Sequence, residues 1–491
     1  MEKPVGNAKI AKNYIAFGQY NCALEEYLIM YNEKPESAKY NRFVAESYSG
    51  IPGSAGKAVK YIEFVINKGK YNADDLFLLA YSYHQNAEFK KAIAACERYL
   101  TEFTPTEIEL AQIEVILSNS KSAVELIKFP INIKFENLGK RVNTKWEDQN
   151  PFVSALENIV IFQTDRKSVM GGYTFGNAFV PDVFVTKLKG KKFSKPRSIG
   201  SMFNSIDVEN IAGYSQDSRY MFISSDAQGF QIFDLKMSYM RPKARSFPKP
   251  MTLEGINETT SNEKEACITN DGTIIIFSSD REGGFGGYDL YLSRILPNGK
   301  WGIPRNLGPT INTTTDENYP LFNENEDGIT FASLGHLTMG GYDIFSSSFS
   351  ENYSKWTTPL NLGYPINTQF DDLTIQFLHN GRLAYKSHYD TSGFGMSDLC
   401  RLVFLDSTPQ LSIIKLTVAV EEEVAQAVLA LQHLTDSNSL YLDSLINNDD
   451  TLDSLSIANL TDSIKLVNHR IREQLTVLSP NCFAEVTVSN S

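Results

Sequence analysis

One asparagine recurs in a shared context five times through the middle of the chain. The copies, each preceded by a short stretch that contains glycine, are Asn143, Asn204, Asn257, Asn312 and Asn367. They are spaced 53 to 61 residues apart, and the sequence between them is rich in β-forming residues. Stacked helices do not explain such a unit, whereas one blade of a β-propeller does. The repeat therefore predicts a cyclic all-β domain.

Each unit also carries the signals of short strands. A turn dipeptide, such as Asp271-Gly272, follows each asparagine by 13 to 15 residues, and a β-rich run comes next. A later aspartate opens another strand, at Asp182, Asp234, Asp289, Asp343 and Asp398. We expect about four strands per unit over residues 127–406. The propeller has five or six blades, since the run Phe129–Phe135 can complete the last blade or begin a sixth.

Two units carry the most complete pattern. One comprises Phe277–Leu292 and Gly299–Gly308, and the next repeats it in Gly340–Phe345 and Lys355–Gly363. They resemble the TolB-type, WD-repeat-like propeller repeat found in exported proteins of Bacteroidota.

Residues 1–126 follow a different period, of 34 or 35 residues. It is marked by Ala11, Ala45 and Ala80, each with a tyrosine three positions later. A small residue lets two helices approach closely, and the tyrosine fills the groove between them, so the period predicts stacked helix pairs with a further capping helix over 106–126.

This segment resembles the tetratricopeptide family over residues 5–104. The resemblance implies a concave peptide-binding face that holds Lys12, Arg42, Glu46, Phe77, Tyr81 and His84. The alternative is that the array packs against the next domain and buries this face.

Charge and composition exclude several classes. The formal charge of −12 disfavours nucleic-acid binding. No stretch is long and apolar enough for a membrane helix, and the visible N-terminus carries no signal-peptide leader. Residues 407–491 are expected to form a small, mostly helical, acidic domain, with 11 acidic and 4 basic side chains after residue 410. Its amphipathic helix over 460–478 is expected to dock on a partner or on the propeller, or to pack within a helical hairpin.

The sequence contains no recognisable catalytic, metal or cofactor motif. Five scattered cysteines and six separate histidines form no zinc pattern. Gly283–Gly287 leads into a strand rather than a helix, so we interpret it as a turn and not a phosphate loop. Asn323–Gly328 begins like a calcium loop, but Leu334 stands where the loop needs glutamate. We therefore expect a protein that is not an enzyme.

As a whole, the chain resembles tetratricopeptide-plus-propeller envelope proteins of Bacteroidota, which are associated with OmpA-family proteins and with type IX secretion and gliding. This implies a scaffold in the periplasm or at the outer membrane, with outer-membrane proteins or lipoproteins as partners. Since the last 80 residues do not look like an OmpA-like domain, direct peptidoglycan binding is not expected. Two alternatives are a propeller-based glycan-binding module or hydrolase with a helical adaptor, and a cytoplasmic adaptor.

Overall fold

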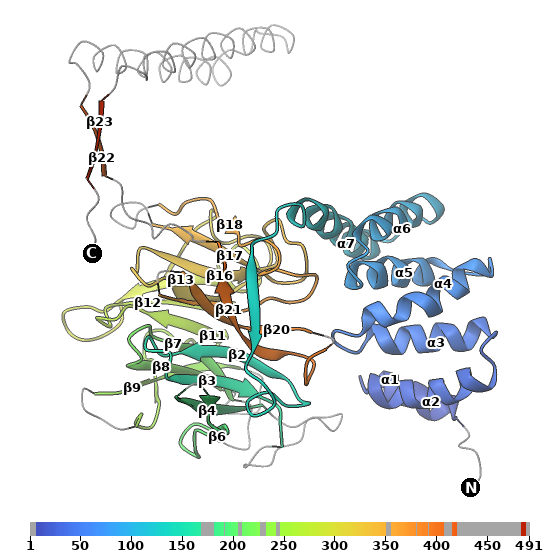
Figure 1. Ribbon diagram of the computed structural model, residues 1–491, viewed down its shortest axis with the longest axis horizontal. Coiled ribbons are helices and arrows are strands. Elements are labelled where there is room, and N and C mark those ends of the chain that lie inside the picture. Colours follow the sequence, from blue (N-terminus) through green and yellow to red (C-terminus); the bar gives the residue numbers. More distant parts are fainter. Residues whose placement is uncertain are drawn as a thin grey trace, which may run out of the picture. The chain divides into compact units, whose positions relative to one another are not determined.

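The computed structural model describes the chain outside residues 1–5, 168–180, 191, 205–208, 226–231, 242–245, 350–354, 380, 391, 407–414, 420–482 and 488–491. Two compact units are present, Met1–Ser407 and Thr408–Ser491. The first unit contains an array of helices followed by a β-propeller of five blades (Figure 1). In the second, the strands β22 (Lys415–Ala419) and β23 (Phe483–Thr487) pair antiparallel, and the predicted helices lie outside the described residues.

Seven α-helices form the array. They are α1 (Ala8–Ala16), α2 (Tyr20–Glu33), α3 (Ala38–Ser49), α4 (Val59–Asn67), α5 (Ala73–Gln85), α6 (Phe89–Glu102) and α7 (Glu107–Leu126), with a 3-10 turn at Ala55–Ala58. Helices α5 and α7 each begin with a capping box. Ala11, Ala45 and Ala80, the residues that mark the predicted period, are fully buried in one continuous core. The small side chains thus lie where neighbouring helices touch.

The propeller consists of five antiparallel sheets. In the first four blades the innermost strand comes first in the sequence, whereas the last blade also includes β1 from the start of the domain. The first two blades contain β2 (Asp148–Val153), β3 (Ile159–Thr164), β4 (Asp182–Lys189), β5 (Lys192–Phe193) and β6 (Arg197–Ser198), then β7 (Glu209–Tyr214), β8 (Tyr220–Ser225), β9 (Asp234–Tyr239) and β10 (Met251–Thr252). The next two contain β11 (Glu263–Ile268), β12 (Ile274–Ser279), β13 (Asp289–Arg294) and β14 (Arg305–Asn306), then β15 (Glu317–Phe322), β16 (Gly328–Ser333), β17 (Asp343–Ser348) and β18 (Leu360–Asn361).

The last blade closes the ring. It combines β19 (Gln376–Leu378), β20 (Leu383–His388) and β21 (Asp398–Phe404) with β1 (Ile133–Asn137), which comes from the start of the domain. Strand β1 pairs antiparallel with β21 over its full length. The predicted early strand therefore completes the last blade, and the propeller has five blades rather than six.

The recurring asparagine joins each blade to the one before it. Asn312 Oδ1 accepts the backbone N–H of Leu290 at 2.8 Å, and its Nδ2 donates to the carbonyl of the same residue at 3.0 Å. The other four asparagines make the same pair of bonds with the residue after the aspartate that begins the third strand: Leu399, Val183, Leu235 and Ile344. One amide side chain thus acts as an extra strand residue at each blade junction.

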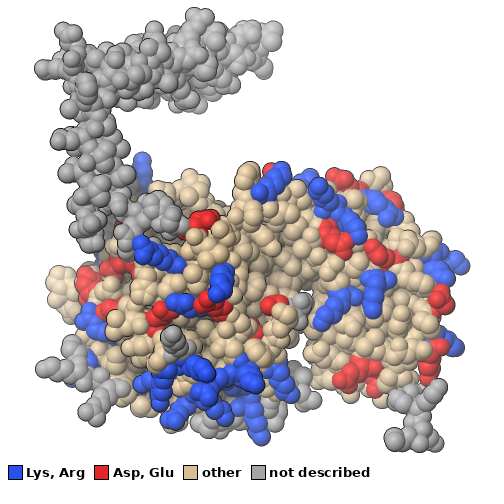
Figure 2. Space-filling model, in the orientation of Figure 1, with Lys and Arg blue, Asp and Glu red and all other residues tan. Residues whose placement is uncertain are grey.

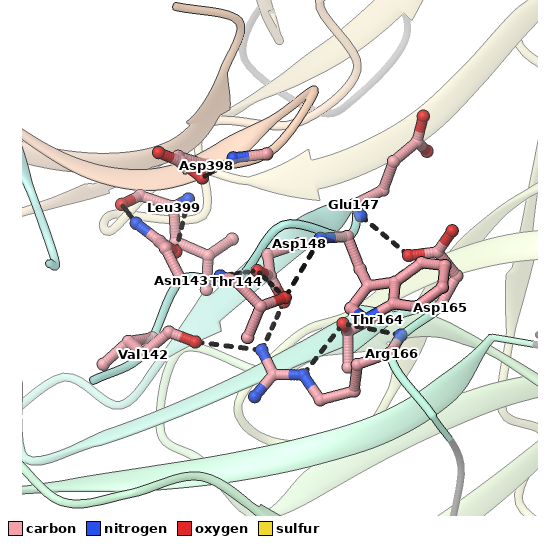
Figure 3. Close-up of polar contacts among 12 residues, drawn as sticks. Val142, Asn143, Thr144, Glu147, Asp148, Thr164, Asp165, Arg166, Asp398 and Leu399 are labelled. Carbon is pink, nitrogen blue, oxygen red and sulfur yellow. Dashed lines mark hydrogen bonds and ion pairs between the residues drawn. The ribbon is translucent and has the colours of Figure 1, made fainter. Parts of the chain in front are cut away.

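An acidic and a basic group reinforce these junctions. Asp148, shown in Figure 3, accepts bonds from the backbone and hydroxyl of Thr144 and pairs with Arg166, which also donates to the carbonyl of Val142. Two further blades repeat the arrangement with Glu263–Arg281 and Asp372–Lys386. Each of these three buried carboxylates is therefore paired with a cation at its blade junction.

The helical array packs on two neighbouring blades through side-chain and main-chain contacts. Asn119 of α7 donates to the carbonyl of Gly340 and accepts from Thr338 at 3.1 Å. Gln85 donates to the carbonyl of Gln369 at 2.9 Å. Phe89 and Ala123 form a small buried cluster with Met339. Among the helices that the structure describes, none has the length and apolar character needed to cross a membrane.

Replacing a junction asparagine should destabilise the propeller. We expect Asn312→Ala to cost roughly 2 to 4 kcal/mol, because the buried N–H and carbonyl of Leu290 lose their partner. Urea unfolding followed by tryptophan fluorescence measures the difference. Asn298→Ala is the matched control: its side chain accepts one bond in an exposed hairpin. Equal stability of the two variants would contradict the proposed role of the asparagine.

Candidate functional site

The helical array carries a groove of about 630 Å³ on one side. Helices α3, α5 and α7 supply most of its lining, which comprises Tyr20, Glu46, Ser49, Gly50, Asp74, Asp75, Phe77, Leu78, Tyr81, Gln112, Val115 and Ile116. Aromatic and aliphatic side chains form its walls, and carboxylates lie among them. The combination offers both apolar contact and charge to a ligand.

Three of the six predicted binding residues line this groove together: Glu46, Phe77 and Tyr81. Lys12 is exposed on α1 and is close enough to Glu46 to lower the pKa of that carboxyl. Arg42 instead forms a two-armed ion pair with the buried carboxylate of Asp75, which joins α3 to α5.

His84 lies away from the groove, in the interior. It is 4% exposed, its Nδ1 lies 2.9 Å from the hydroxyl of Ser120 on α7, and its ring packs edge-on against Phe89. Burial lowers the pKa of His84 to about 4. The tetratricopeptide resemblance predicts His84 on the concave face, whereas in the structure α7 packs over it.

The groove is acidic. The pKa of Glu46 is raised first by burial in the groove and then by the nearby carboxylates of Asp75 and Asp74, while Arg42 and Lys12 oppose the shift. Asp74 is exposed at the start of α5, where the helix N-terminus favours a carboxylate. A cationic group that entered the groove would relieve this repulsion.

Acidic and tyrosine side chains continue from the groove onto the propeller. Burial raises the pKa of Tyr81, and the carboxylate of Asp371, which precedes β19, raises it further. Asp371 accepts the backbone N–H of Tyr342 at 3.0 Å, and the Tyr342 hydroxyl donates to Asp316 at 2.9 Å. Sequence reasoning missed Asp316 and Asp371; their signal is that each directly precedes the buried acidic residue, Glu317 or Asp372, that follows the recurring asparagine.

The carboxylates on this face of the propeller already bind internal donors. Asp316 accepts the N–H of Tyr288, and Asp280 accepts both the N–H and the side-chain amide of Asn262. Glu265 accepts the hydroxyl of Ser278 at 2.7 Å, and burial raises its pKa to about 7. These carboxylates therefore hold neighbouring loops and strands in place through hydrogen bonds.

A small cavity lies among the inner strands of the propeller. The cavity there has a volume of about 10 Å³, enough for about one water molecule. Gln376 of β19 bonds to β2 of the neighbouring first blade: its amide donates to the carbonyl of Val153 at 2.8 Å and its oxygen accepts the N–H of Val153 at 2.5 Å.

The glycine-rich segment and the calcium-like loop noted in the sequence both form turns that are held by internal hydrogen bonds. In Gly283–Gly287 the N–H groups of Phe285 and Gly286 donate to Asp289, and a side chain at Gly286 would clash with the carbonyl of Thr315. In the calcium-like loop, Asn323 and Asp327 bond to each other across a hairpin turn. Over the described residues, no three His, Cys, Asp or Glu side chains form a group able to hold a metal.

No protein-family model and no curated protein matches the chain. Solved structures do match. The α-L-arabinofuranosidase from Lactobacillus brevis shares 9% identity, with 60% of this chain and 94% of that protein covered and a TM-score of 0.35. The xylan β-1,4-xylosidase from Bacillus halodurans shares 11%, covering 57% and 54%, also with a TM-score of 0.35. An oligogalacturonate lyase in complex with manganese shares 11%, covering 54% and 68%, with a TM-score of 0.29. At these identities the likeness concerns the propeller fold alone.

The burial of His84 predicts loss of stability in acid. Its pKa of about 4 in the folded protein lies below the unfolded value of about 6.5, so the unfolded protein binds the proton more tightly. The stabilisation is complete above pH 6.5 and declines, by roughly 3 kcal/mol in all, as the pH falls to 4. We expect His84→Gln to remove this part of the pH dependence. Urea unfolding of both proteins between pH 7 and 4 checks this; parallel curves would contradict it.

Proposed function

We propose that this protein is a non-catalytic scaffold that binds protein partners, and that the groove of the helical array holds a peptide segment of a partner. The observation that carries this proposal is the groove of about 630 Å³, lined by Phe77, Tyr81, Glu46 and Asp74. An extended segment with apolar and basic side chains fits its lining, because the walls are apolar and its charge is acidic.

The attachment of the array to the propeller supports this role. The contacts include those of Gly53, Gln85, Phe89, Asn119 and Ala123, none of which lines the groove. These contacts therefore do not occupy the groove lining. The propeller provides a rigid body on which the array is held, and repeat surfaces of this kind bind partners without reactive side chains.

The more specific identity also belongs to the proposal. The buried alanine period and the groove on the array support a tetratricopeptide-like array, and the repeated asparagine and aspartate support a TolB-type propeller. Through this resemblance we place the protein in the periplasm or at the outer membrane of a bacterium of the Bacteroidota, within an envelope complex such as the type IX secretion, gliding or outer-membrane assembly machinery. Its partners there are outer-membrane proteins or lipoproteins.

The non-catalytic part of the proposal rests on how the propeller uses its charged groups. Glycoside hydrolysis needs two carboxylates that flank a bound sugar. Here Asp148, Glu263 and Asp372 are each paired with an arginine or a lysine, and Glu317 accepts bonds from Thr313 and Ser333. The acidic residues repeated in the blades thus have a structural use.

The groove predicts a charge preference in peptide binding. We expect a fluorescein-labelled peptide of alternating Lys and Leu to bind more tightly than its Glu and Leu counterpart, as measured by fluorescence anisotropy. Glu46→Lys with Asp74→Lys should weaken binding by about tenfold or more, because two attractive charges become repulsive.

The control for this experiment is Glu33→Lys with Glu114→Lys, which changes the net charge equally at exposed helical positions outside the groove lining. Phe77→Ala should weaken binding of the Lys and Leu peptide but leave it the tighter ligand of the two peptides. Equal loss in the control and groove variants would reject the groove as the binding site.

A non-catalytic scaffold should not cleave polysaccharides or peptides. We expect incubation with arabinan, xylan, oligogalacturonate and peptide libraries to release no products detectable by mass spectrometry. Reproducible cleavage would overturn the scaffold proposal in favour of a hydrolase, particularly if a variant that preserves the fold, such as Glu147→Gln, abolished it; burial raises the pKa of Glu147 to about 7.

A further inference from the structure

Basic side chains gather on one edge of this acidic protein. Figure 2 shows Lys and Arg clustered over the part of the propeller where Figure 1 places β3, β4 and β6. The exposed cations of this region, which we call the basic edge, are Lys140, Arg141, Lys187, Lys189, Lys192, Lys195 and Arg197. None of them forms an ion pair with a carboxylate among the described residues. In a protein of net charge −12 this is a local reversal of sign.

The basic edge borders a groove of about 610 Å³ between the last and the first blade. The segment 136–141 forms one wall, and the hairpin of β4 and β5 supplies Leu188, Lys192 and Phe193 to the other. Deeper in the groove, Arg401 is neutralised by Glu157 and Glu136. The cations left to attract a ligand are thus those at the rim, and Leu138, Leu188 and Phe193 provide apolar contact.

The groove begins at the end of an unusual outer strand. Strand β1 has five residues, whereas the strands that occupy the same position in the other four blades, β6, β10, β14 and β18, have two. Within the described chain β1 pairs on one side only, with β21. Because N–H and C=O groups alternate in direction along an antiparallel strand, Ile133, Phe135 and Asn137 direct theirs away from β21.

We propose that the free edge of β1 and the basic edge together bind an extended acidic peptide segment of a partner protein, with apolar residues at alternate positions. The segment adds to β1 as a further strand, which satisfies the outward backbone groups over about 17 Å. Its carboxylates meet Lys140, Arg141 and Lys192, and its apolar side chains meet Leu188 and Phe193.

A peptide fits these observations better than another polyanion. Nucleic acids and acidic polysaccharides offer negative charge, but they have no main-chain amide groups to pair with a strand edge. A membrane surface is flat and would not reach the walls of a groove. The edge of β1 favours a peptide over other polyanions, and the cations favour an acidic peptide over a basic one.

The test uses a fluorescein-labelled peptide of about eight residues in which Asp and Val alternate, measured by fluorescence anisotropy with the full chain. The combined variant Lys140→Glu, Arg141→Glu and Lys192→Glu should weaken binding by about tenfold or more. The control variant Lys70→Glu, Lys249→Glu and Lys300→Glu, which has the same net charge, should bind within about twofold of the natural protein. Circular dichroism and the melting temperature show whether both variants fold.

A second measurement leaves the protein unchanged. In a peptide strand paired with β1, alternate residues direct their N–H groups toward β1 and the others direct theirs away. N-methylation of the first set should therefore weaken binding strongly, and N-methylation of the second set only weakly. Equal effects of the two sets, or equal binding of a Lys and Val peptide, would overturn the proposal.

Two other anionic ligands, an acidic polysaccharide and an anionic membrane, are tested in parallel. If polygalacturonate, or vesicles of phosphatidylcholine and phosphatidylglycerol, bind through the same lysines while the Asp and Val peptide does not, the peptide proposal is wrong. This proposal and that for the helical groove fail separately, because the basic-edge variant should still bind the Lys and Leu peptide normally.

Discussion

The propeller depends on one amide side chain per blade junction. Each recurring asparagine donates to and accepts from the backbone of the preceding blade, as in the pair formed by Asn312 and Leu290. An apolar residue could fill the same volume, but it would leave a buried N–H and a buried carbonyl without partners. The nearby acidic residues serve the same junctions: Asp148 and Glu263 each accept from the loop after the asparagine and from an arginine. The repeat that reveals the fold is therefore also what holds it together.

Ring closure has two consequences for function. Because β1 completes the last blade, the connection from α7 enters the propeller beside the blades on which the array packs. The same closure places a longer strand at the outer edge of one blade than at any of the other four. One unit thus presents an acidic groove on its helices and a basic edge on its propeller. Two surfaces of opposite charge would select ligands of opposite charge, which is the basis of the two binding proposals.

Much of the fold followed from the sequence. The spacing of Ala11, Ala45 and Ala80 correctly predicted helices that pack at small residues, and the asparagine period predicted the blades. Of the candidate site, Glu46, Phe77 and Tyr81 were named together by the tetratricopeptide resemblance, and all three line the groove. Neither that resemblance nor the helical period could show that α7 covers His84, or that Asp75 holds Arg42, because both depend on the neighbour that packs there. Asp316, Tyr342 and Asp371 come together only through contacts between blades.

By itself, the sequence determined the two repeat periods, the kind of element in each and the residues that face inward, because helices and strands impose their own spacing on apolar side chains. It left the number of blades open, since a strand at the start of a domain can pair at either end of a ring. Only the tertiary structure decided that β1 pairs with β21, that these contacts of the array with the propeller do not occupy the groove lining, and that scattered lysines form one edge. The physical reason is that pairing, burial and local charge are properties of residues far apart in the sequence, which meet only after folding.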